Sequence, residues 1–92
     1  MIEWKKIQED AYIVIYEQKE SDESYNRALF DIESKLFSVT HTEFVRNNEP
    51  RLIPQNDSTY YSAKYGHWTT RHAYLGLEDL RVLSSLAEKY LN

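Results

Sequence analysis

Three histidines and one arginine are the residues of this 92-residue chain best suited to chemistry. With a tyrosine, His41, His67, His72 and Arg71 could form a metal-free nuclease or phosphotransfer site, in which histidine acts as acid and base. The spacing argues against such a site. His67 and His72 are five residues apart, about 16 Å along an extended strand, which is too far to share one scissile bond. We therefore expect no catalytic residue and no enzyme.

A metal or cofactor site is not expected either. The chain has no cysteine, which excludes thiolate zinc sites and a disulfide framework. A helical pair of histidines five residues apart does not share a face, and no histidine or carboxylate completes the i, i+4 spacing of helical zinc sites. His41 stands alone in an alternating segment, which favours a structural or surface role over a metal ligand.

The strongest local signal is an acid-free stretch over residues 58–77, STYYSAKYGHWTTRHAYLGL, in a chain with fifteen Asp and Glu. A stretch of this length would carry about three acids by composition. It also holds four of the eight tyrosines, one of the two tryptophans and two of the three histidines. Aromatic and positively chargeable side chains are thus concentrated in one place, which predicts either a buried aromatic hairpin or a recognition surface.

The strands and helices that must position these residues are predicted from the periodicity of apolar residues and from the positions of glycine and proline. Apolar and β-branched runs predict an interior strand over 11–18, a second strand over 39–46 and a short strand near residues 2–7. Helical spacing of apolar residues predicts helices over 22–37 and 76–91. Prolines at both ends of 50–54 predict a loop, and Gly66 with His67 predicts a two-residue turn within an aromatic hairpin.

These elements predict an α+β fold, with an antiparallel or mixed sheet of about four strands and two helices on one face. A single domain over residues 1–92 is expected, as a monomer or small homo-oligomer, because the chain shows no repeat, linker or low-complexity tract. No apolar run has the length of a secretory core or a bilayer span. We therefore expect a soluble cytoplasmic protein that does not contact a membrane.

In the predicted hairpin, antiparallel partners share a face, so Tyr61, Tyr65, Trp68 and His72 would line an aromatic side. The other side would be polar and positive. An aromatic strand face commonly packs as core against a helix, but Tyr, Trp and Arg also concentrate at protein interfaces. Both interpretations stay open at this point.

The function that we expect is a small protein-binding module: an inhibitor, immunity factor or accessory subunit of bacterial, plasmid or phage type. The partner-binding residues are predicted around the hairpin tip, namely Tyr60, Lys64, Tyr65, His67, Trp68 and Arg71. The alternative is single-stranded nucleic-acid binding, with rings stacked on bases and Lys64 and Arg71 at phosphates. A net charge of −4 argues against the alternative. Acids in the 17–33 segment could instead face a partner with a basic groove, such as a nucleic-acid enzyme.

Overall fold

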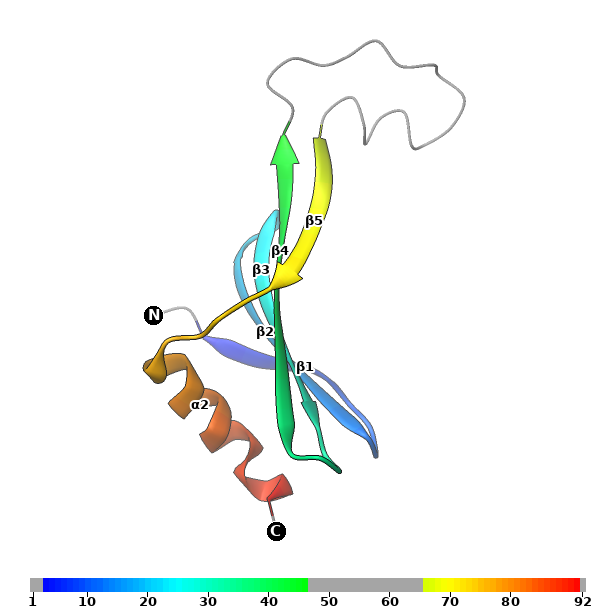
Figure 1. The fold of residues 1–92 in the computed structure, drawn as a ribbon, viewed down its shortest axis with the longest axis vertical. Helices are drawn as coiled ribbons and strands as arrows, with labels where there is room; N and C mark the ends of the chain where they lie inside the picture. Colours follow the sequence, from blue (N-terminus) through cyan, green and yellow to red (C-terminus); the bar gives the residue numbers. More distant parts are fainter. Residues whose placement is uncertain (1–2, 47–65, 92) are drawn as a thin grey trace.

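The computed structural model describes residues 3–46 and 66–91, which form a five-stranded antiparallel sheet and a C-terminal helix (Figure 1). The sheet order follows the chain order. Its strands are β1 Trp4–Glu9, β2 Ile13–Ser21, β3 Ser24–Asp31, β4 Leu36–Arg46 and β5 Gly66–His72. Helix α2 spans Leu77–Ala87 and continues as the 3-10 turn η1, Glu88–Tyr90. Strands β4 and β5 extend together away from α2, beyond the part of the sheet that lies beside this helix (Figure 1).

Short turns with side-chain hydrogen bonds join the first four strands. Before β2, the Oδ1 atom of Asp10 accepts the backbone N–H groups of Tyr12 and Ile13 at 2.7 and 2.9 Å. After β3, Oδ1 of Asp31 accepts the N–H of Ser34 at 2.9 Å. Such Asx turns satisfy backbone donors locally and reverse the chain tightly. The N–H bonds hold the pKa of both carboxyls below the usual range.

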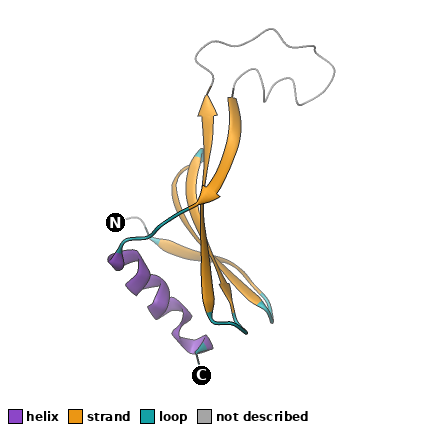
Figure 2. Cartoon of the chain, in the orientation of Figure 1, coloured by secondary structure: helices purple, strands orange, loops and turns teal. Residues whose placement is uncertain are grey.

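The hydrophobic core lies between α2 and one face of the sheet (Figure 2). Leu83 and Ala87 of the helix pack against a set of buried sheet residues, namely Trp4, Val14, Tyr16, Ala28 and Phe30. Burial raises the pKa of the Tyr16 hydroxyl, which donates a hydrogen bond to the Leu86 carbonyl at 3.4 Å. We call this face of the sheet the helix side.

The opposite face, which we call the open face, is not covered by any helix in the described part of the chain (Figure 2). The pairing register assigns residues to it, because directly paired residues of antiparallel strands share a face. Ile15 and Leu29 pair on this face and are each half-buried. Apolar side chains therefore occur on both faces of the sheet, but α2 packs on one of them.

The sequence-based fold class is wrong in its count of elements. It predicted about four strands and two helices, whereas the described residues hold five strands and one helix. The strands predicted over 11–18, over 39–46 and near the N-terminus are confirmed, and so is the C-terminal helix. The error lies in the segment 22–37, which was predicted to be helical.

Residues 22–37 form a two-residue turn, strand β3, the next turn and the start of β4. The helical interpretation relied on Tyr25, Ala28, Leu29, Ile32 and Leu36, which recur three and four residues apart. The structure instead uses a two-residue period, in which Ala28 and Phe30 are buried on the helix side. Because Leu29 on the open face is also apolar, the alternation that marks a strand was hidden.

The predicted turn at Gly66 and His67 is also wrong. Both residues lie in β5, where Gly66 pairs with Arg46 and His67 with Val45. Gly66 does have the positive φ that suggested a turn, 150°. The glycine is needed for a second reason, since a Cβ at this position would overlap the Val45 carbonyl oxygen and lie 2.8 Å from the Phe44 ring. The other strand of the predicted hairpin, residues 58–65, lies outside the described residues.

Candidate binding surface

Three aromatic side chains from three neighbouring strands meet on the open face. Trp68 of β5 pairs directly with Phe44 of β4, and their ring centroids are 5.5 Å apart in an edge-on arrangement. Tyr25 of β3 lies on the same face, with its ring centroid 6.2 Å from that of Trp68. These spacings are typical of stabilising aromatic pairs. We call Tyr25, Phe44 and Trp68 the aromatic patch.

The patch is accessible to solvent. Trp68 is 51% exposed, whereas Trp4 in the core is 3% exposed. Tyr25 and Phe44 are each half-buried, and both rings lie close to the Trp68 ring, which still keeps about half of its surface exposed. A large indole held against two rings already has restricted rotamers, so it loses little side-chain entropy when it contacts another surface. The patch therefore has the properties of a preorganised contact site.

Two arginines extend the patch at its margins, and each is neutralised by an acid. The Arg27 guanidinium lies 4.7 Å from the Tyr25 ring centroid, and that of Arg46 lies 5.4 Å from the Phe44 centroid. Arg27 Nε donates to Glu17 at 3.0 Å, and Arg46 forms an ion pair with Glu23. The margin of the patch therefore combines cationic and anionic groups and does not form a positive field.

Of the six predicted partner-binding residues, Trp68 belongs to the patch. His67 and Arg71 are exposed on the same strand but lie on the helix side of the sheet, because they pair with Val45 and His41. A partner with one flat surface cannot contact the side chains of both Trp68 and Arg71, because they lie on opposite faces of the sheet. The remaining three residues, Tyr60, Lys64 and Tyr65, lie outside the described part of the chain.

The three histidines are not brought together. His41 and His67 share the helix side of the sheet, but they are four residues apart in register, about 13 Å along the strands. His72 pairs with Thr40 and therefore points to the open face. The residues proposed for a metal-free nuclease thus lie on two faces of the sheet, and the geometry gives no support to that arrangement.

A row of polar side chains crosses the helix side at the edge of the core. Asp79 in the first turn of α2 accepts, through Oδ1, the Trp4 Nε1–H at 3.0 Å and a Gln18 Nε2–H at 3.1 Å. Gln18 Oε1 in turn accepts an Asn26 Nδ2–H at 3.1 Å, and Asn26 Oδ1 lies 2.7 Å from His41 Nδ1. These contacts connect the helix to four strands, β1 to β4.

We interpret this row as a structural element. Trp4 is 3% and Gln18 is 8% exposed, so their donors need protein acceptors, and the Asp79 carboxylate supplies one. His41 Nε2 lies 3.6 Å from Glu43 Oε2, which completes the row on β4. The row orients α2 over the sheet and ends the apolar core. It was not predicted from the sequence, because it depends on the register of distant strands.

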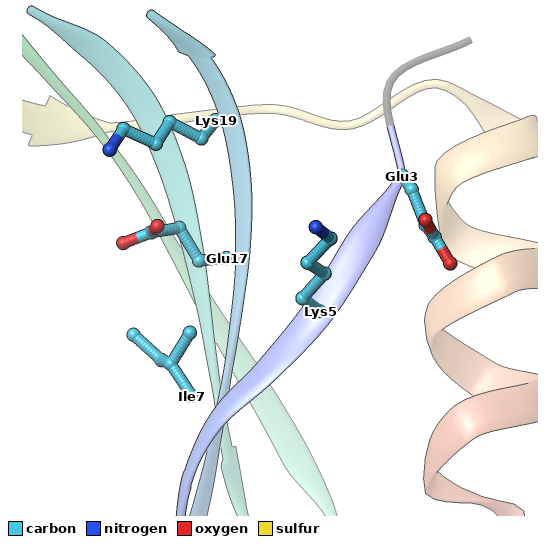
Figure 3. A pocket seen from close by; sticks show the side chains of 5 residues that line it. All are labelled: Glu3, Lys5, Ile7, Glu17 and Lys19. Atoms are coloured by element: carbon cyan, nitrogen blue, oxygen red, sulfur yellow. The ribbon is translucent and has the colours of Figure 1, made fainter. Parts of the chain in front are cut away.

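A hollow of about 380 Å³ lies between β1 and β2 on the open face (Figure 3). It is lined by two acids, two lysines and one apolar residue: Glu3, Lys5, Ile7, Glu17 and Lys19. Glu17 is paired with Arg27, and Lys19 lies 2.9 Å from Asp22. The lining charges balance, and the hollow selects for neither an anion nor a cation.

Two members of the patch, Tyr25 and Phe44, were missed in the sequence analysis. Tyr25 was assigned to the apolar stripe of the predicted helix. Phe44 lies in the predicted strand 39–46, in which the Thr40, Thr42 and Phe44 side chains share a face. That alternation places Phe44 on a polar face, which is a signal for an exposed aromatic residue that could have been used.

Comparisons with known proteins add no assignment. No family model matches this chain, and neither a curated protein nor a solved structure matches it. Within residues 3–46 and 66–91, no group of three or more His, Cys, Asp or Glu side chains could hold a metal ion. No helix in these same ranges has the length and apolar character needed to cross a bilayer.

Proposed function

We propose that this protein is a small protein-binding module that uses the aromatic patch on the open face of its sheet. In that role it would serve as an inhibitor, an immunity factor or an accessory subunit. The observation that carries the proposal is the geometry of Trp68: half-exposed, held by two other rings, and on a face that no described helix covers. Tryptophan and tyrosine are the side chains that most often anchor protein interfaces.

The charges at the patch support a protein partner over a nucleic acid. Single-strand binders combine stacking rings with cations that contact phosphates. Here Arg27 and Arg46 lie over the rings but are already paired with Glu17 and Glu23, and the chain carries a net charge of −4. A phosphate backbone would have to displace these acids. A partner protein with its own mixed charges would not.

The open face also carries exposed apolar side chains elsewhere on β1 and β4. Ile7 is 46% exposed and Leu36 is 68% exposed, and both belong to strands whose other side carries the core. Interface centres combine such aliphatic surface with aromatic anchors and a polar rim.

The test is affinity capture with the wild-type protein, Trp68→Ala and Arg71→Ala, each with and without nuclease treatment. Arg71→Ala is the matched control, because Arg71 is exposed on the same strand but on the helix side. A partner protein retained by the wild type and by Arg71→Ala, and lost with Trp68→Ala, supports the proposal. Truncating a central tryptophan anchor costs about 2 to 4 kcal/mol of binding, a loss of about thirtyfold or more.

Two results would overturn the proposal. If nuclease treatment abolishes retention, the ligand is a nucleic acid. If Trp68→Ala retains the partner as well as the wild type does, the contact surface lies elsewhere. Circular dichroism of each variant establishes that the sheet is intact, so that loss of folding is not mistaken for loss of contact.

A further inference from the structure

The outer edge of β5 presents backbone groups without a neighbouring strand among the described residues. The Ala73 N–H donates to the Val39 carbonyl at 3.0 Å, so Ala73 directs its backbone groups toward β4. Backbone direction alternates along an antiparallel strand. The N–H and C=O groups of Trp68, Thr70 and His72 therefore point outward, away from β4.

The two edges of the sheet differ in how they are protected. At the other edge, β1 carries Lys5 and Lys6 and has a register shift between Lys6 and Gln8. Lysines and bulges are the features that prevent a further strand from pairing. Strand β5, GHWTTRH, pairs with β4 without a register shift and contains neither lysine nor proline. Its edge is regular and suited to accept a strand.

We propose that this edge pairs with β5 of a second copy of the chain, antiparallel and about a two-fold axis at Thr70. The outward groups of Thr70 would then bond to those of Thr70 in the other copy, and Trp68 would lie opposite His72. The two sheets would become one continuous sheet, with both aromatic patches on the same face. This inference does not rest on the proposed function, because it is argued from the backbone groups of the β5 edge; on the open face it involves Trp68 only through a cross-strand contact with His72.

Two side-chain arrangements favour pairing of β5 with a second copy in this register. On the helix side, Arg71 lies opposite the neutral Thr69 of the second copy, so the two exposed arginines do not oppose each other. On the open face, the Trp68 ring lies against an imidazole, a cross-strand aromatic contact that stabilises a sheet. A two-fold axis at Thr70 also pairs every outward backbone donor of β5 with an outward acceptor of the second copy.

The first test introduces a charge at Thr70, on the proposed two-fold axis. Thr70→Lys and Thr70→Glu should each raise the dimer dissociation constant about a hundredfold, because each variant places like charges face to face. An equimolar mixture should restore a dimer of about 22 kDa, twice the 11.0 kDa chain, in sedimentation velocity. Ser84→Lys and Ser84→Glu on the exposed side of α2 are matched controls and should leave the wild-type mass unchanged.

The second test needs no substitution. Hydrogen exchange of the wild-type protein at low and high concentration should show slower exchange at high concentration for the Trp68, Thr70 and His72 amides. The amides of Thr69 and Arg71, which point to β4, should show no such dependence. A wild-type protein that stays at 11.0 kDa at all concentrations would overturn the proposal, as would dimers that tolerate Thr70→Lys. Such tolerance would indicate pairing through another surface.

Discussion

Replacing Asp79 by alanine should destabilise the fold by about 2 to 4 kcal/mol, because a buried donor left unsatisfied costs about 1 to 3 kcal/mol. The carboxylate accepts hydrogen bonds from Trp4 and Gln18, and both residues are almost fully buried. Loss of an acid from the first turn of α2 adds about 0.3 to 1 kcal/mol through the helix dipole. A domain of this size has about 5 to 14 kcal/mol of stability in total, so the effect is large.

Two variants separate these contributions. Glu78→Ala also removes an acid from the first turn of α2, where Glu78 is exposed, so it should cost about 0.5 kcal/mol through the dipole alone. Asp79→Asn keeps an acceptor oxygen and should cost less than Asp79→Ala. Urea unfolding measures all three, and the Asp79→Ala midpoint should fall by about 1 to 3 M. Equal midpoints for Asp79→Ala and Glu78→Ala would refute the structural role of the polar row.

Three further predictions concern packing, backbone and pH. Leu83→Ala should lower the free energy of unfolding in urea by about 2 to 5 kcal/mol, because Leu83 is fully buried. Leu80→Ala, at a position 41% exposed, should lower it clearly less. Similar losses for the two variants would place the core elsewhere. Gly66→Ala should cost about 1 to 3 kcal/mol and shift the NMR signals of the Phe44 ring, since its Cβ would overlap that ring; unchanged spectra would contradict this. The pKa of Asp31 is lowered in the folded state, so its contribution to stability is present above about pH 4 and is lost as the pH falls through the folded-state pKa. In Asp31→Asn the urea midpoint should therefore change less with pH on the acid side than in the wild type. An unchanged acid-side slope would contradict the turn geometry.

Local patterns in the sequence were sufficient to predict several strands and the C-terminal helix. Strand β2 contains the run IVIY, whose β-branched residues favour extended backbone, and α2 carries Leu83 and Ala87 at helical spacing. The segment 22–37 could not be assigned in this way. Its apolar residues face both sides of the sheet, so its periodicity resembles that of a helix although Ala28 and Phe30 alternate as in a strand.

The candidate site depends on pairing between distant segments. The sequence analysis placed Trp68 in a contact surface, and the structure leaves it half-exposed. The neighbours of Trp68 could not be predicted, because β4 pairs with β5 across the residues 47–65 that separate them. The hairpin hypothesis used Gly66 as a turn residue, since a positive φ fits a turn as well as it fits a close approach to a ring.

The most direct measurement of the proposed contact is site-specific photo-crosslinking in cells, with a benzophenone amino acid in place of Trp68 or of Arg71. The two positions lie on one exposed strand and on opposite faces of the sheet. We predict a cross-linked partner protein from position 68, distinct from the self-pair of about 22 kDa, and little or none from position 71. Equal cross-linking at both positions, or a partner captured from position 71 alone, would contradict binding through the aromatic patch.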